Sequence, residues 1–141
     1  MAIYLLKTEP DEFSYDDLVA KKVEPWDGVT NAAAQKHMRA VKKGDRAFIY
    51  HTGKERRIAG LAEVVRGAYP DPDKPGLTAS GDPKFVLFDC RPVKAAKKQC
   101  TLADVKTDER FANFALVKQA RLSVMPVPSD LAKALRSMAG L

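Results

Sequence analysis

The chain has 141 residues, of which 45% are hydrophobic and 30% charged, and its formal net charge at pH 7 is +6. This length suits one domain with a single hydrophobic core. No apolar run approaches the roughly 20 residues that cross a bilayer, and the N-terminus lacks the basic region and long apolar stretch of a signal peptide. We therefore expect a cytoplasmic protein without a membrane partner. The positive charge favours a polyanionic partner, with nucleic acid ahead of a membrane surface.

The first third of the chain predicts one strand and two helices. Residues 2–7, "AIYLLK", have the β-branched and aromatic character of a buried strand. Ser14 is placed to cap a short helix over residues 15–22, because its hydroxyl can accept from a free N–H of the first turn. The turn sequence "VEPWDGV" follows, and Asn31 is placed to cap a second helix over residues 32–41.

The middle of the chain predicts three strands and one long loop. "RAFIYH", residues 46–51, alternates as a strand does, and the long apolar run at residues 58–69 is a second strand. Within it, Gly60 indicates a bulge or a close approach of another group. Residues 70–83 contain four prolines and are expected to form a loop, which we interpret as a mobile flap beside a binding site. Residues 84–97 are the third strand of this region.

The last third predicts short helices and one more strand. Thr101 can cap one or two short helices within residues 101–113, and residues 115–121 are ambiguous. A strand is expected at residues 122–127 and a terminal helix at residues 128–140. Because strands and helices do not alternate regularly, a doubly wound parallel sheet is unexpected. The pattern instead predicts an α+β fold, a small mixed β-barrel of about five to six strands with peripheral helices.

Catalytic and metal motifs are missing from the sequence. It contains no dinucleotide fingerprint, Walker loop, GxSxG or HExxH segment. Cys90 and Cys100 do not form a CxxC pair, and neither His37 nor His51 is spaced to complete a zinc site with them. We expect two reduced structural thiols, no metal and no organic cofactor. A small hydrolase that uses His51 stays open as an alternative.

A pocket for a flat ligand is better supported than a catalytic site. A nucleobase needs flat apolar surfaces for stacking and a few polar groups at its edge. Trp26 and Tyr50 can stack, Asn31 can both donate and accept, and Thr8 and Ser123 carry hydroxyls. Both aromatic side chains can equally be core residues. Trp26, however, lies in a polar turn, where a purely structural tryptophan is less expected.

Six segments, taken in order, resemble the landmark segments of the EVE domain. They are "YLLKTEPDEFSYDDL", "EPWDGVTN", "GDRAFIYHT", "GLAEVV", "DPKFVLFDCRPV" and "LVKQARLSV". The resemblance runs from about residue 3 to residue 127, and it implies one EVE domain over residues 1–141. It also implies a PUA-like fold and kinship with the YTH readers of methylated adenine. The implied function is non-catalytic recognition of a modified base in DNA or RNA through an aromatic-lined pocket.

The resemblance also assigns site residues. The positions that match the family's motifs, with Thr8 and Ser123, give a base-binding pocket of Lys7, Thr8, Trp26, Asn31, Tyr50, His51, Arg121 and Ser123. We expect a cationic rim that contacts phosphates, built from Arg56, Arg57 and Arg66 together with Lys7 and Arg121. Thr30 and Ala32 replace the arginine and tyrosine usual in the family, which predicts a roomier and less cationic pocket. A partner-binding scaffold without a pocket is the remaining alternative, and we expect a monomer.

Overall fold

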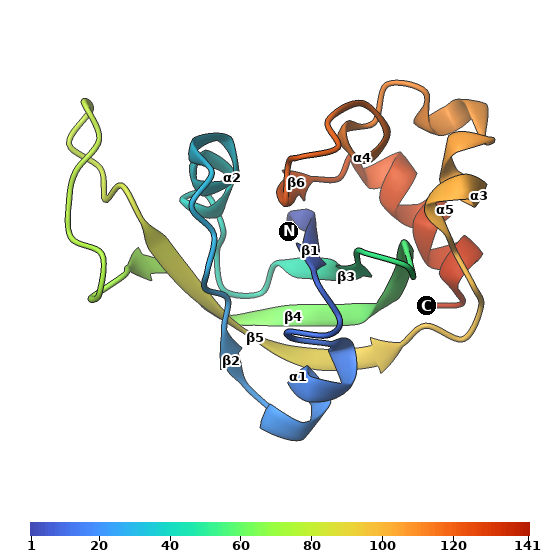
Figure 1. The fold of residues 1–141 in the computed structure, drawn as a ribbon, viewed down its shortest axis with the longest axis horizontal. Helices are drawn as coiled ribbons and strands as arrows, with labels where there is room; N and C mark the ends of the chain where they lie inside the picture. The colour runs from blue at the N-terminus through green and yellow to red at the C-terminus, as the bar shows by residue number, and fades with distance from the viewer.

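The computed structural model describes all residues from 1 to 141 and contains one mixed sheet with helices around it (Figure 1). The strands are β1 (Ile3–Thr8), β2 (Glu24–Pro25), β3 (Arg46–His51), β4 (Arg57–Pro70), β5 (Val86–Ala95) and β6 (Val124–Pro126). The helices are α1 (Tyr15–Lys21), α2 (Ala32–Met38), α3 (Leu102–Lys106), the short 3-10 helix η1 (Glu109–Phe111), α4 (Ala115–Lys118) and α5 (Ser129–Ala139). No helix combines the length and apolar character that would let it span a membrane.

The sheet is open, with the strand order β2-β5-β4-β3-β1-β6. β1 runs parallel to β3, and every other neighbouring pair is antiparallel. The α+β class, the strand number and the peripheral helices are therefore confirmed, whereas the sheet does not close into a barrel. Both edge strands are very short and each ends in a proline, Pro25 in β2 and Pro126 in β6. Proline has no N–H to donate, so these edges are poorly suited to pairing with each other.

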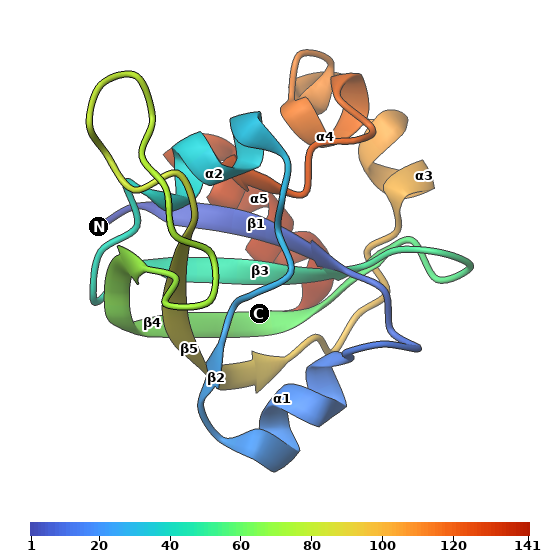
Figure 2. The same cartoon turned by 60° about the vertical axis from the view of Figure 1, so that its left-hand side comes forward.

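The core lies on the central strands. Every β3 residue from Ala47 to His51 is buried, because helices and loops cover both faces of the sheet at this point. α5 passes behind the sheet in the view of Figure 2, and α1 packs beside β5. The largest fully buried side chains include Phe48, Phe88 and Phe111. The continuous apolar run "AFIY" in β3 thus reflects burial on both faces.

Local chemistry fixes where α1 starts. Ser14 and Asp17 form a capping box, in which the Ser14 hydroxyl accepts from the Asp17 N–H and the Asp17 carboxylate accepts from the Ser14 N–H. The next residue, Tyr15, is buried, and its hydroxyl donates to the Leu61 carbonyl at 2.8 Å. A Cβ on Gly60 would lie 2.4 Å from the Tyr15 ring. The close approach that was expected at Gly60 is confirmed, and the missing side chain makes room for this tyrosine.

The remaining sequence-based elements agree closely with the structure. The expected helical region after Thr101 splits into α3 and η1, and the ambiguous stretch at 115–121 contains α4. Residues 70–83 lie in the irregular connection between β4 and β5, apart from Pro70 at the end of β4. The two-residue strand β2 falls in a predicted turn. It forms because Glu24 pairs with Cys90 of β5, a long-range partner that no local pattern announces.

Candidate functional site

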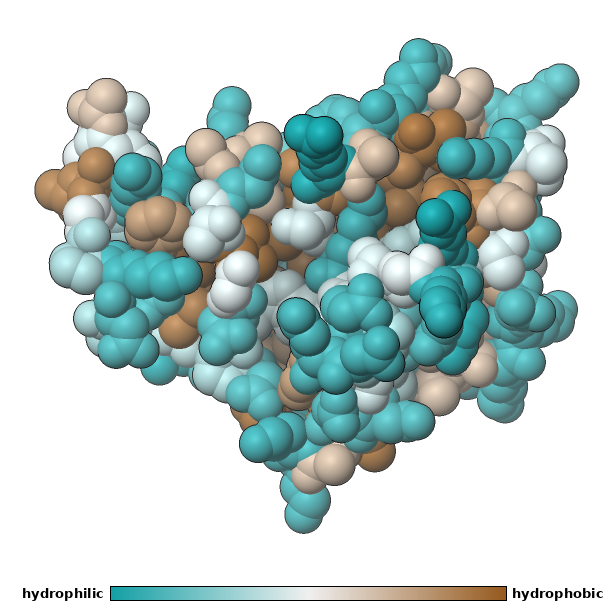
Figure 3. Space-filling model, viewed as in Figure 1, coloured by the Kyte–Doolittle hydropathy of each residue, from teal (hydrophilic) through white to brown (hydrophobic).

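The main cavity lies between the end of β1, the end of α1 and the segment that joins β2 to α2. Its volume is about 600 Å³, and it opens on the face shown in Figure 3, where a hollow is visible near the middle. It is lined by Lys7, Thr8, Glu9, Glu12, Phe13, Lys21, Glu24, Pro25, Trp26, Asp27, Gly28, Val29, Thr30, Asn31 and Ser123. Five of the eight predicted base-binding residues are therefore brought together here.

Trp26 forms a fixed wall of the cavity. Its backbone N–H donates to the Phe88 carbonyl at 2.8 Å, which ties the residue to the end of the sheet, and only 5% of its surface is exposed. Phe13 packs edge-on against it, with ring centroids 6.1 Å apart and an interplanar angle of 80°. The indole N–H has no partner within the chain, and no polar side-chain atom is sealed from solvent without one. This donor is therefore unpaired and keeps some contact with solvent.

Asn31 presents an amide donor at the cavity mouth. Its Oδ1 accepts from the Ala34 N–H at 3.0 Å, so it caps α2 as the sequence predicted. The side-chain NH₂ makes no hydrogen bond within the chain and is exposed to solvent. The turn before it needs Gly28, whose φ of +75° is the left-handed region that glycine adopts without strain.

The opposite wall comes from the ends of β1 and β6. The Lys7 backbone N–H donates to the Ser123 carbonyl at 2.9 Å, and the Lys7 ammonium donates to the Ala120 carbonyl at 2.9 Å. Burial lowers the pKa of Lys7. The Thr8 hydroxyl donates to the Phe13 carbonyl at 2.6 Å and is therefore occupied. The Ser123 hydroxyl has no partner and remains free to bind a ligand.

Four carboxylates also face the cavity, and sequence reasoning did not single them out. They are Glu9, Glu12, Glu24 and Asp27, and with Lys7 and Lys21 they give the lining a formal charge of −2. All four lie in the turn segments "TEPDEF" (residues 8–13) and "EPWD" (residues 24–27), where a carboxylate is normally solvated. Only the pairing of β2 with β5 and of β1 with β3 brings the two turns to one hollow.

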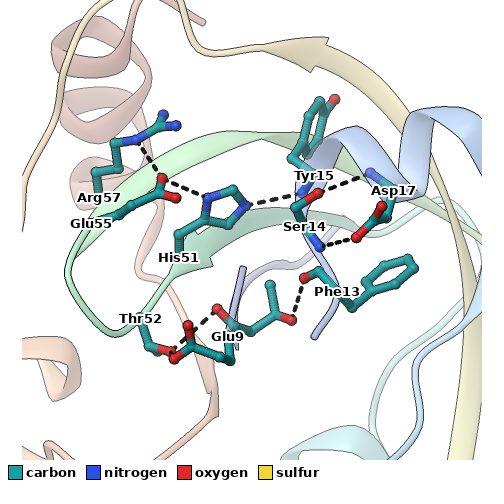
Figure 4. Close-up of polar contacts among 10 residues, drawn as sticks. Glu9, Phe13, Ser14, Tyr15, Asp17, His51, Thr52, Glu55 and Arg57 are labelled. Atoms are coloured by element: carbon teal, nitrogen blue, oxygen red, sulfur yellow. Dashed lines mark hydrogen bonds and ion pairs between the residues drawn. The ribbon is translucent and has the colours of Figure 1, made fainter. Parts of the chain in front are cut away.

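Tyr50 and His51 do not line the cavity. His51 is 4% exposed, and its Nε2 accepts from the backbone N–H of Tyr15 at 3.0 Å (Figure 4). Its Nδ1 must then carry the proton, which it donates to Glu55 Oε1 at 2.9 Å. This hydrogen bond holds the pKa of Glu55 below its usual value. Tyr50 is buried in the core, and burial raises its pKa. Both side chains face inward because β3 is covered on both sides.

None of the predicted rim arginines lines the main cavity. Arg57 Nε forms an ion pair with Glu55 at 2.9 Å, and Arg56, at a positive φ of 47°, donates from Nε to a backbone carbonyl of the β3–β4 turn. Arg66 lies over the ring of Tyr69, 3.7 Å from its centroid.

Arg121 differs from the other three arginines. It is exposed, and its side chain makes no hydrogen bond, ion pair or cation–π contact within the chain. It directly follows Ala120, the residue whose carbonyl holds the Lys7 ammonium at the cavity edge. Asp89 accepts from the Tyr69 hydroxyl at 2.5 Å and is no partner of Arg121. Arg121 is thus placed beside the main cavity, although it does not line it.

The irregular segment between β4 and β5 does not border the main cavity. It lines two smaller hollows beside α2, and Arg39, the C-cap residue of α2, donates to the Pro83 and Lys84 carbonyls at 3.3 Å each. One of these hollows shares Thr30 with the main cavity, and Ala32 lines only that hollow. Residues 70–83 were expected to form a mobile flap beside the binding site, but they do not lie at the main cavity. Their mobility stays a prediction.

The thiols and possible metal ligands form no reactive centre. Cys90 and Cys100 are both buried and free. Burial raises the pKa of Cys90 to about 12 and that of Cys100 to about 11, so both are protonated at neutral pH. No group of three or more His, Cys, Asp or Glu side chains is arranged to hold a metal ion.

The fold and the site together define a small α+β domain whose main cavity is open and polar and lies beside the sheet. The family model of the EVE domain matches residues 2–138, and the chain belongs to this family. The resemblance seen in the sequence is thereby confirmed.

Among its relatives is the human thymocyte nuclear protein 1, which is 33% identical over 155 residues, covering 90% of this chain and 69% of the human protein. The NMR structure of Rpa0253 from Rhodopseudomonas palustris superposes with a TM-score of 0.88 at 45% identity, covering 99% of this chain and 94% of that one. The crystal structure of human THYN1 protein in complex with 5-methylcytosine-containing DNA has a TM-score of 0.85 at 30% identity, covering 98% of both chains.

Proposed function

We propose that this protein binds a modified base of DNA or RNA in the main cavity and does not act on it chemically. The observation that carries the proposal is the human THYN1 protein bound to 5-methylcytosine-containing DNA, whose fold matches over 98% of both chains. The +6 net charge of the chain agrees with a nucleic-acid partner.

The chemistry of the cavity lining favours a base over a phosphate as the occupant. A lining with a formal charge of −2 repels phosphate, whereas carboxylates accept hydrogen bonds from exocyclic amino groups such as that of cytosine. Asn31 offers a free amide donor for a ring nitrogen or carbonyl of the base, and Ser123 offers a hydroxyl. Trp26 and Phe13 supply the apolar walls.

The two alternative functions, a small hydrolase that uses His51 and a partner-binding scaffold without a pocket, have less support. A hydrolase needs a base with a free lone pair, and both ring nitrogens of His51 are occupied by Tyr15 and Glu55. A scaffold without a pocket is disfavoured by a cavity of about 600 Å³ that has free polar groups on its wall.

The test compares short DNA and RNA strands that contain 5-methylcytosine with the same strands containing cytosine, by calorimetry at a fixed salt concentration. We expect tighter binding of the modified strand, with no change in the oligonucleotide afterwards by mass spectrometry. Equal affinity for every modified and unmodified pair would overturn the proposal for this base. Light scattering on the same samples tests the expected monomer.

Replacing Asn31 tests whether its side-chain amide contacts the base. Asn31→Ser keeps an N-cap for α2 but removes the amide donor, and we expect about a fivefold loss of affinity for the modified strand. The matched control is Thr101→Ser, which keeps the cap of α3 and lies outside the cavity lining. An Asn31→Ser variant that binds as tightly as the control would exclude Asn31 as a contact.

A further inference from the structure

A second hollow adjoins the main cavity and has no part in the proposed base site. It has a volume of about 330 Å³ and lies between the start of α2 and the segment before β5. These two parts of the chain run side by side in Figures 1 and 2. Thr30 belongs to the linings of both cavities, so the two hollows are direct neighbours.

The two cavities carry opposite charge. The main cavity has a formal charge of −2, whereas the adjoining hollow is lined by Arg39 and Lys84 and by no acidic residue. Nη1 of Arg39 donates to the Pro83 and Lys84 carbonyls, which fixes the guanidinium and leaves its Nε and Nη2 without partners in the chain. A phosphate beside the main cavity is therefore attracted to this side.

Apolar groups lie next to these cations. Leu77 is 68% exposed, an unusual position for a large apolar side chain, and it lines the hollow together with Phe85. The Phe85 ring has the ammonium groups of Lys74 and Lys84 each 5.6 Å from its centroid. An aromatic ring with an exposed leucine and adjacent cations is the combination that binds a nucleotide, since the base contacts the apolar surface and the phosphate contacts the cations.

We infer that the adjoining hollow is a subsite for the nucleotide next to the modified base in the strand. The phosphate that links the two nucleotides lies at Thr30, against Arg39 and Lys84, and the neighbouring base packs on Leu77 and Phe85. The inference rests on the proposed function, and it adds that a single modified nucleoside fills only part of the site. Recognition therefore includes the sequence next to the modified base.

The test uses two ligands, the nucleoside 5-methyl-2′-deoxycytidine and a DNA trinucleotide with 5-methylcytosine at its centre. The subsite variant is Leu77→Ala/Lys84→Gln, whose two positions are exposed and are expected to tolerate the changes without unfolding. The matched control is Val93→Ala/Lys94→Gln, two exposed neighbours on β5 that line neither cavity.

We expect the wild-type protein to bind the trinucleotide about tenfold more tightly than the nucleoside. The subsite variant should lose about tenfold in affinity for the trinucleotide and keep its affinity for the nucleoside. Its slope of log affinity against log salt for the trinucleotide should fall by about 0.7, the loss expected for one phosphate contact on a single strand. The control should match the wild type for both ligands.

The other outcomes separate the two proposals. If the subsite variant binds the trinucleotide as the wild type does, or loses affinity equally for both ligands, the subsite is wrong and the proposed function stands. If the wild-type protein binds neither ligand, the proposed function fails for this base and the subsite fails with it.

Discussion

At the scale of single residues, His51 and His37 offer a comparison within one chain. His51 is buried and both of its ring nitrogens are hydrogen-bonded, whereas His37 is half-buried on α2 and has no hydrogen-bond partner. Replacing His51 by alanine leaves the buried N–H of Tyr15 without an acceptor and opens a small cavity, which together cost about 2–4 kcal/mol.

We therefore expect His51→Ala to lower the free energy of unfolding by that amount in a urea titration, while His37→Ala changes it little. Binding of the modified strand, measured well below the melting temperature, should be unchanged in both variants. A folded His51→Ala protein that no longer binds would show that His51 has a role at the ligand after all.

The pKa of Tyr69 makes the stability of the protein depend on pH in the alkaline range. Burial and the hydrogen bond to Asp89 raise the pKa of Tyr69 to about 12, above the ordinary value of 10. A raised pKa in the folded state means that its contribution to stability is complete below pH 10 and disappears as the pH approaches 12. The free energy of unfolding should thus fall more steeply between pH 10 and 12 in the wild type than in Tyr69→Phe. If the free energy of unfolding fell equally steeply with pH in both proteins, the raised pKa of Tyr69 would be wrong.

At the scale of elements, the packing of α1 on the sheet depends on Gly60 in β4. A methyl group at this position would lie 2.4 Å from the Tyr15 ring, which is held by its hydroxyl at Leu61 and by its backbone N–H at His51. Because the ring cannot move aside, Gly60→Ala should destabilise the protein by about 1–3 kcal/mol through overpacking. Thermal unfolding by circular dichroism measures this. An unchanged melting temperature would mean that α1 shifts freely on the sheet.

The elements also show what the sequence can and cannot predict. Ser14, Asn31 and Thr101 were each expected to cap a helix, and each does, because capping depends on residues within one turn. β2 was missed because two residues have no pattern of their own and pair only with distant β5. Closure of the sheet was wrongly predicted, since the number of strands does not decide whether the two edge strands meet.

The main cavity likewise contains residues that the sequence predicted and residues that it did not. Trp26 was found because a tryptophan is unusual in a polar turn, and Asn31 because its amide can both donate and accept. The structure places both at the cavity. Tyr50 and His51 have equally suitable chemistry, but burial of β3 turns them away from it. The carboxylates of the cavity were missed because charged residues in turns are common, and only the tertiary fold brings Glu9 and Glu24 to one hollow.

At the scale of the whole molecule, the positive charge is unevenly distributed. The chain carries +6, yet the main cavity is acidic, so the cations that attract a polyanion must lie outside it. A base can then enter an acidic cavity while its phosphates remain at the surface. Affinity should accordingly fall as the salt concentration rises, although the contacts to the base themselves are insensitive to salt.

Arg121 is exposed, has no ion pair and follows Ala120 at the edge of the main cavity, where a phosphate of the strand can reach it. Arg121→Gln should weaken binding of modified and unmodified single strands by the same factor. It should also reduce the slope of log affinity against log salt by about 0.7, the loss expected for one phosphate contact on a single strand. The matched control is Arg57→Gln, since Arg57 is paired with Glu55 and lines neither cavity. If Arg121→Gln and Arg57→Gln reduced the slope equally, the phosphates would respond only to the net charge of the protein. Arg121 would then make no specific contact with the strand.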